Sequence, residues 1–233
     1  MRCFIIITIT LFFVLASCKK DSKNPSSGSF APSYTLTSFP NHIGDTSYYY
    51  ITQKVTNFYY LPSTTPPITS TTSSNFYSTV VADSILPNGI VGKIWYINGF
   101  PLTGAVRRLV YYDSTLLAYV FIPILLCSSD SEQPMILKMP LLENSSWVNT
   151  INNTKDTCKT TSAILYPYNG SSQLALQLIR EPYYNTTGPA TFKYYKYIIG
   201  DKGFYQIEYT NIDGYLGFST TTEYKTTLIK TNF

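Results

Sequence analysis

The chain has 233 residues, of which 44% are hydrophobic and 13% are charged, and its formal net charge is +4. The charged share is about half of that in a typical soluble domain. So weak a charge, with no cluster of Lys and Arg among aromatic residues, argues against a nucleic-acid partner. The length suits one hydrophobic core, and a composition rich in Tyr and Thr favours β-sheet.

The N-terminal segment 1–17 has the pattern of a secretory signal peptide. Arg2 provides a short basic start, and an almost unbroken apolar run follows over 4–14. This run is too short to cross a bilayer, which takes about 20 apolar residues, and it suits the apolar core of a signal peptide. Leu-Ala-Ser at 15–17 then leads to Cys18, an arrangement that resembles the bacterial lipobox. We expect cleavage before Cys18 and lipid attachment to its thiol; the alternative is an ordinary signal peptide with an incidental cysteine.

Acyl chains on Cys18 are expected to hold the protein on a membrane. Each buried CH₂ contributes about 0.8 kcal/mol, and two chains give stable anchoring where one gives marginal binding. Residues 18–32 are rich in Ser, Lys, Pro and Gly, which predicts a flexible tether. We therefore expect a lipoprotein of the bacterial cell envelope, anchored by palmitate-like chains in the outer membrane. The sequence leaves open whether it faces the periplasm or the cell exterior.

Residues 33–233 predict a single all-β domain. Runs of alternating apolar and polar residues dominate this part, and we find no convincing amphipathic helix. About ten to twelve short strands joined by short turns indicate an antiparallel meander that forms a curved sheet or a (half-)barrel. The predicted strands cover 47–60, 75–86, 90–97, 107–112, 116–126, 135–139, 146–149, 158–166, 174–181, 193–199, 204–210 and 220–229.

Turn and loop signals separate these strands. Asn-Gly pairs at 88–89, 98–99 and 169–170 predict hairpin turns, and Asp-Gly at 213–214 predicts another. The stretch 61–74 is rich in Pro, Thr and Ser. It predicts an exposed loop, because Pro removes a donor from the strand ladder.

A short internal repeat suggests two related halves, about 33–133 and 134–233. Segments 39–47 and 139–147 both have an apolar residue followed by Pro, then a gap of three residues before Gly44 or Asn144. Small polar residues follow in both segments and lead into a predicted strand. The alternative is one undivided domain.

Two cysteines remain in the mature chain besides Cys18, namely Cys127 and Cys158. An even pair in an oxidising compartment suggests a disulfide, which would stabilise the fold by about 3 kcal/mol. The alternative is two free, buried thiols that pack as small apolar groups. The one histidine is His42, and no Cys-x-x-Cys or His-x-x-x-His spacing occurs. We therefore expect no metal ion and no other cofactor.

The chain resembles a broad set of Bacteroidetes lipoproteins of unknown function. Their "FPxxxGxxW/Y" motif corresponds to 39–50, and "LxFPLxxGxxW" corresponds to 137–147. A cysteine-containing strand corresponds to 158–165, and a late tyrosine-rich hairpin corresponds to 194–209. The chain departs from the pattern at 143–144, where Glu-Asn replaces the usual Gly. The resemblance implies a β-rich domain like the curved half-barrel of periplasmic lipoprotein carriers, and it supplies no catalytic residues.

Candidate catalytic groups are few and dispersed. An enzyme needs titratable groups brought together, and nothing in the sequence places Asp201, Glu208 and His42 beside one another. We therefore expect no enzymatic activity. The least favoured alternative is a hydrolase with acidic residues gathered around His42.

Clustered tyrosines are the remaining candidates for a binding surface. Consecutive residues of a strand point to opposite faces, so each cluster puts rings on both faces. Exposed rings stack on sugars or line apolar cavities; alternatively, one ring of each pair is core and the other covers the sheet. We expect a non-enzymatic binding or scaffold domain that contacts an envelope protein or a glycan, and the alternative is a carrier of lipid or another hydrophobic ligand. The clusters are at 48–50, 59–60, 111–112, 183–184, and 194–195 with 197.

Overall fold

A computed structural model describes residues 34–59, 66–100, 104–124, 135–151, 154–183, 191–215 and 217–233. The described residues all belong to one compact unit. The described residues form strands and no helix, which confirms the all-β prediction; accordingly, they include no helix that could cross a membrane. The strands are β1 (Thr35–Leu36), β2 (Thr46–Tyr59), β3 (Ile68–Ile85), β4 (Val91–Phe100), β5 (Gly104–Asp113), β6 (Ala118–Ile124), β7 (Met135–Lys138), β8 (Leu141–Leu142), β9 (Ser146–Ile151), β10 (Thr154–Thr160), β11 (Ile164–Tyr168), β12 (Ser171–Tyr183), β13 (Thr191–Gly200), β14 (Gly203–Tyr215) and β15 (Phe218–Thr231).

One antiparallel sheet contains all of these strands except β1 and β8, which form a small sheet of their own. It consists of two meandering arms that meet where β2 pairs with β15. The first arm runs from β2 through β3, β4, β5 and β6 to β7. The second arm runs from β15 through β14, β13, β12 and β10 to β9, with β11 attached to β12. The chain therefore leaves the centre of the sheet along one arm and returns along the other.

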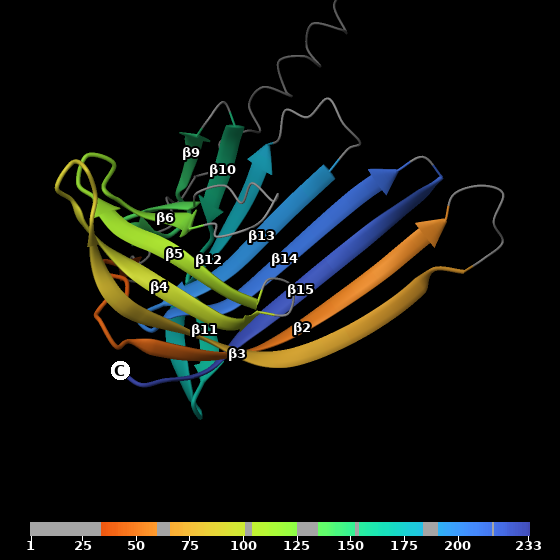
Figure 1. The fold of residues 1–233 in the computed structure, drawn as a ribbon, viewed down its shortest axis with the longest axis horizontal. Coiled ribbons are helices and arrows are strands. Elements are labelled where there is room, and N and C mark those ends of the chain that lie inside the picture. Colours follow the sequence, from red (N-terminus) through yellow and green to blue (C-terminus); the bar gives the residue numbers. More distant parts are fainter. Residues whose placement is uncertain are drawn as a thin grey trace, which may run out of the picture. The chain divides into compact units, whose positions relative to one another are not determined.

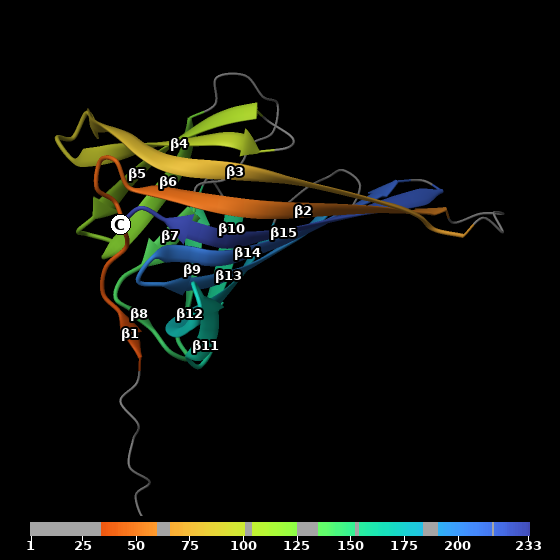
Figure 2. The same cartoon turned by 90° about the horizontal axis from the view of Figure 1, so that it is seen from below.

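The sheet curls strongly (Figure 1), and its edge strands β7 and β9 approach each other (Figure 2), so that it is nearly closed into a barrel. At this seam Asn149 Nδ2 on β9 donates a hydrogen bond to the carbonyl oxygen of Ile136 on β7, at 3.3 Å. Trp147 of β9 and Leu137 of β7 belong to the same buried cluster. The predicted curved sheet or half-barrel is confirmed.

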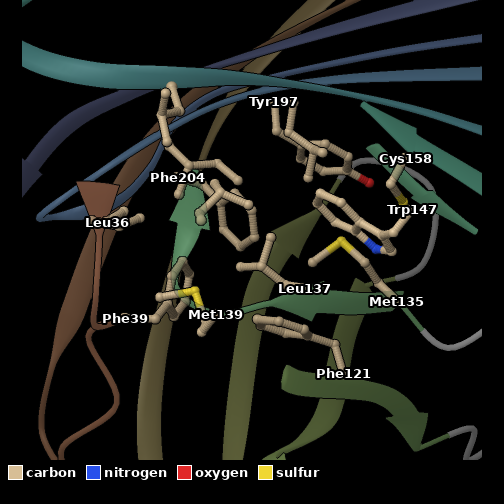
Figure 3. Packing of buried hydrophobic residues seen from close by; sticks show 14 of the residues in the cluster. Leu36, Phe39, Phe121, Met135, Leu137, Met139, Trp147, Cys158, Tyr197 and Phe204 are labelled. Carbon is tan, nitrogen blue, oxygen red and sulfur yellow. The ribbon is translucent and has the colours of Figure 1, made fainter. Parts of the chain in front are cut away.

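Large side chains fill the interior of the barrel (Figure 3). The ring centroid of Phe39 lies 5.0 Å from that of Phe204, 5.6 Å from that of Phe121 and 5.8 Å from that of Trp95. Burying apolar area contributes roughly 25 cal/mol per Å², so this cluster is the main source of stability in the curled part. The cluster comprises Leu36, Phe39, Val110, Phe121, Met135, Leu137, Met139, Leu141, Trp147, Cys158, Leu176, Leu178, Tyr197, Ile199 and Phe204.

Strands β2, β3, β14 and β15 run on beyond the curled part as a single layer, with no described strand above or below their outer ends (Figure 2). We call this part the sheet extension; it comprises 53–59 of β2, 68–75 of β3, 209–215 of β14 and 218–224 of β15. Thr and Ser are frequent in it. Thr suits a pleated surface, and hydroxyls tolerate water on both faces, so this layer needs no apolar cover.

The turn predictions are correct at some positions and wrong at others. Asn169 and Gly170 have φ of 50° and 76° and connect β11 to β12, as a type I′ hairpin requires. The predicted loop at 61–74 is wrong from Ile68 onward, because these residues begin β3. The predicted turns at 98–99 and 213–214 are also wrong, since β4 and β14 continue through them. The β4–β5 register shifts between Ile97 and Phe100, so the first pair marks an irregularity rather than a turn.

The two repeat segments share a backbone feature. Gly44 and Asn144 both have positive φ, 94° and 51°. β2 begins two residues after Gly44, and β9 begins two residues after Asn144. Similar local sequences thus introduce the first long strand of the first arm and the first strand of the second arm. A relation between whole halves stays a prediction.

Candidate functional site

A row of side chains crosses the inner face of the sheet at the boundary of the extension. Residues that pair in register on neighbouring strands project to the same face. Consecutive register pairs connect eight such residues, one on each strand from β9 to β3. This cross-strand row consists of Trp147, Cys158, Arg180, Tyr195, Tyr209, Tyr224, Gln53 and Thr72.

Three stacked tyrosines form the centre of the cross-strand row. The ring centroids of Tyr195 and Tyr209 are 4.6 Å apart with planes 22° apart. Those of Tyr209 and Tyr224 are 5.6 Å apart with planes 14° apart. Next to Tyr224 in the row, Gln53 Nε2 donates a hydrogen bond to the Tyr224 hydroxyl at 3.1 Å, and the Thr72 hydroxyl donates one to Gln53 Oε1 at 3.4 Å. The rings therefore cover one another's faces, and Gln53 fixes the hydroxyl of Tyr224 within the row.

A buried ion pair lies on the other side of the tyrosines, where Arg180 of the row meets Asp156. The guanidinium carbon of Arg180 lies 5.1 Å from the ring centroid of Tyr195. Its Nε donates to Oδ2 of Asp156 at 2.6 Å, and the two side chains are 6% and 2% exposed. Burial raises the pKa of the Asp156 carboxyl, and Arg180 opposes this shift. The pair fixes the position of Arg180 against the first tyrosine ring.

Beyond the row, the inner face of the extension carries mostly neutral hydrogen-bonding groups. Thr220 and Thr222 of β15 pair in register with Asn57 and Val55 of β2 and with Asp213 and Asn211 of β14. The Thr220 hydroxyl donates to Asn57 Oδ1 at 2.9 Å. At the outer end of the sheet extension, which we call the tip, Tyr59 and Phe218 pair in register and are 44% and 37% exposed. This face therefore combines hydroxyl and amide groups with two exposed aromatic side chains.

A small cleft lies at the other end of the barrel. It holds about 270 Å³ of empty space, part of it open to solvent. The buried Ser78 hydroxyl, which has no hydrogen-bond partner within the described part, lies in its wall. Burial raises the pKa of Tyr49, another lining residue, to about 12. The lining residues are Phe39, Pro40, Asp45, Ser47, Tyr49, Ser78, Val80, Trp95, Lys202, Gly203, Phe204 and Phe233.

The predicted cysteine sites fall partly outside the described residues. Cys18 and Cys127 both lie outside them, so lipid attachment and the disulfide stay predictions. Cys158 lies on β10, is 1% exposed and forms no disulfide with another described residue. Burial, reinforced by the charge of Asp156, raises the pKa of this thiol to about 12. A thiol with so high a pKa is protonated and unreactive at neutral pH.

The structure does not bring the predicted acid and base residues together. The side chain of His42 is 93% exposed, and its Nδ1 lies 3.5 Å from Oδ2 of Asp45. Asp201 accepts a hydrogen bond from the Tyr205 hydroxyl, while Glu208 pairs with Lys196 at 3.3 Å. Within the described ranges, no three His, Cys, Asp or Glu side chains are placed to hold a metal ion.

The tyrosine cluster at 48–50 divides between core and surface, as the alternative interpretation expected, whereas the clusters at 59–60 and 183–184 reach beyond the residues whose side chains the structure describes. Tyr49 is 5% exposed, whereas its neighbours Tyr48 and Tyr50 are 38% and 44% exposed. Sequence reasoning missed the cross-strand row, because the row depends on pairing between strands far apart in the chain. Gln53 and Tyr224, for example, are 171 residues apart.

Searches of protein-family models, of curated proteins and of solved structures find no match to this chain.

Proposed function

We propose that this chain is a non-enzymatic binding domain on an envelope lipoprotein, and that the inner face of its sheet extension binds a neutral polysaccharide. The observation behind the proposal is that this layer is uncovered although its inner face carries an ordered row of side chains. In the proposal, acyl chains on Cys18 hold the protein in the outer membrane, and 18–32 tether the binding domain to it.

The chemistry of the inner face favours a glycan over a protein partner. Protein interfaces usually have an apolar core patch, whereas the middle of this face presents hydroxyl and amide groups such as those of Thr222 and Asn57. These groups exchange hydrogen bonds with sugar hydroxyls. Tyr59 and Phe218 at the tip add aromatic surface against which a sugar ring packs. Low formal charge suits a neutral ligand better than an acidic one.

The carrier alternative has weaker support. Pockets for drug-sized ligands measure about 300–1,000 Å³. The space in the cleft that admits a water-sized sphere is only about 10 Å³, which is far below this range. Side chains such as Phe121, Leu137 and Trp147 occupy the described interior of the barrel, where an acyl chain would have to lie. A ligand that binds outside the barrel would not have to displace these side chains.

Two neighbouring threonines provide the test. Thr222 points to the inner face and Thr221 to the opposite face, and both are half-buried. The full chain, extracted in detergent, is tested for binding to immobilised dextran, mannan and xylan. We expect Thr222→Lys to weaken binding of the preferred polysaccharide at least tenfold, and Thr221→Lys to change it less than twofold. Equal losses in both variants, or a wild-type chain that binds no neutral polysaccharide, would contradict the proposal.

A further inference from the structure

The hairpin turn between β5 and β6 exposes two leucines. Leu116 and Leu117 are 46% and 57% exposed. Leu117 also has φ of 48°, a left-handed conformation that costs a residue with a Cβ atom about 1–2 kcal/mol and that turns usually give to Gly or Asn. An exposed leucine in this position contributes little to the core, so the fold alone gives no reason for it.

The neighbouring turn, between β3 and β4, is apolar as well. Ile85 and Val91 pair in register where this hairpin ends, and they are 76% and 56% exposed. Gly92 pairs with Tyr111 on β5, so the next residues outward, Val91 and Tyr112, lie side by side. Tyr112 is 41% exposed. The two adjacent turns therefore share one exposed apolar surface.

The described part of the chain begins at this same end of the domain. The backbone N–H of Met139 donates a hydrogen bond to the carbonyl oxygen of Leu117 at 2.7 Å, and β8 begins two residues later. Leu142 of β8 pairs with Thr35 of β1 and is 45% exposed. The β1–β8 sheet and the β3–β4 turn both lie opposite the outer ends of the extension (Figure 2). We call these exposed side chains the apolar end: Ile85, Val91, Tyr112, Leu116, Leu117 and Leu142.

We infer that the apolar end docks on the lipid bilayer to which Cys18 is proposed to anchor the chain, an inference that rests on that anchor. Cys18 precedes Tyr34 by 16 residues. A flexible chain of this length has a typical end-to-end distance of about 22 Å, so the predicted tether would keep the apolar end close to the membrane surface. Side chains such as Leu116 and Ile85 would then enter the boundary between headgroups and acyl chains, where burial contributes roughly 25 cal/mol per Å² of apolar area.

The β5–β6 turn already pairs several of its backbone polar groups, which suits a lipid environment. An amide moved out of water without a hydrogen bond costs roughly 2–7 kcal/mol. Oδ1 of Asp113 accepts hydrogen bonds from the backbone N–H groups of Thr115 and Leu116, at 2.9 and 3.1 Å, and the Leu117 carbonyl accepts the one from Met139. Aliphatic side chains on turns favour lipid over a protein partner, because the cores of protein interfaces are enriched in aromatic residues and Arg.

Docking of this kind would orient the proposed binding face. The extension runs away from the apolar end (Figure 2), so its tip, with Tyr59 and Phe218, would stand away from the bilayer. Docking uses side chains of the turns rather than the inner face of the extension. It is therefore tested separately from polysaccharide binding.

Quenching of tryptophan fluorescence by brominated lipid tests the docking. The two native tryptophans, Trp95 and Trp147, pack in the barrel interior, so the wild-type chain supplies the background. The full chain, extracted in detergent, is reconstituted with vesicles of phosphatidylcholine and phosphatidylglycerol, with or without bromine on the acyl chains. Leu116→Trp adds a tryptophan at the apolar end. Ile68→Trp is the matched control, because Ile68 is 54% exposed and lies on the extension.

We expect brominated acyl chains to reduce the fluorescence of the added tryptophan at least twofold in Leu116→Trp, and by less than a tenth in Ile68→Trp. If the chain floats with the vesicles, equal quenching of both variants, or no quenching above background in Leu116→Trp, overturns the docking alone. A chain that does not float with the vesicles contradicts the anchor and the docking together. If Leu116→Trp fails to accumulate as folded protein, Ile85→Trp decides by the same criteria.

Discussion

The Nε atom of Arg180 lies 2.6 Å from Oδ2 of Asp156, and the two side chains are only 6% and 2% exposed. Removing one partner leaves the other charge buried without compensation, which typically costs about 3–5 kcal/mol. We therefore expect Arg180→Ala to lower the free energy of unfolding by about this amount in urea denaturation.

Lys54 and Glu223 provide the control for this pair. Their contact is 3.0 Å long, but the side chains are 51% and 48% exposed. Exposed pairs contribute about 0–1 kcal/mol, so Lys54→Ala should change the stability by no more than this. Equal losses from Arg180→Ala and Lys54→Ala would contradict the assignment of a buried ion pair beside the tyrosines of the row.

Tyr209 connects the two halves of the stacked tyrosine row. Replacing it with leucine removes its contacts with Tyr195 and Tyr224, and each aromatic pair contributes about 0.5–1.5 kcal/mol beyond area burial. We expect Tyr209→Leu to destabilise the domain by about 1–3 kcal/mol in thermal or urea unfolding. Tyr50→Leu is the control, because Tyr50 is 44% exposed, and it should cost under about 0.5 kcal/mol. A larger loss from Tyr50→Leu would show that the stacked row adds little.

The buried thiol of Cys158 predicts a pH-dependent stability. Its pKa rises from an ordinary 9.0 to about 12 in the fold, so folding favours the protonated form. This contribution is complete below about pH 9 and is lost as the pH rises toward 12. The slope is at most about 1.4 kcal/mol per pH unit.

The Cys158→Ala variant separates the pH-dependent stability that is due to the thiol from that due to the tyrosines. Under reducing conditions, the stability difference between wild type and Cys158→Ala should shrink by up to about 1.4 kcal/mol from pH 9 to pH 10. A difference that stays constant over this range would mean that the thiol does not titrate in the way its burial implies. The mass of the unreduced chain separately decides whether Cys127 and Cys158 form a disulfide.

Gly200 has no room for a side chain. A Cβ there would run into the ring of Tyr205, which is fully buried and stacks on Tyr166 at 5.3 Å. Overpacking of this kind costs about 1–3 kcal/mol, and we expect Gly200→Ala to reach the upper half of that range in urea unfolding. Gly170→Ala meets no atom within 4 Å but adopts φ of +76°. Its cost should stay near about 1–2 kcal/mol, and a larger cost there than at Gly200 would contradict this packing.

The sequence was sufficient to predict the fold class and some of the turns. Alternation along the strands shows directly in the sequence, and the Asn169-Gly170 turn needs the positive φ values that those residues favour. The same logic failed at Ile68 to Ser74, which lie in an exposed layer. Alternation disappears where both faces of a strand meet water, so a polar strand there resembles a loop. Nearby prolines strengthened that wrong prediction.

The candidate site was harder to predict than the fold. Tyr209 and Tyr224 could be picked out as strand residues, but their stacking depends on the register between β14 and β15. The row also needs Gln53, which reaches it only because the first and last long strands pair. Pairings of this range leave no local signal, so neither composition nor spacing indicated the row.

Native mass spectrometry of the full chain, extracted from its membrane in mild detergent, tests the central claim that binding takes place outside a filled barrel. The account predicts a mature chain that starts at acylated Cys18 and carries no stoichiometric apolar ligand, because side chains occupy the interior. A lipid that stays bound in a one-to-one ratio would contradict it and would make the barrel interior the binding site. A chain without acyl groups on Cys18 would contradict the proposed anchor.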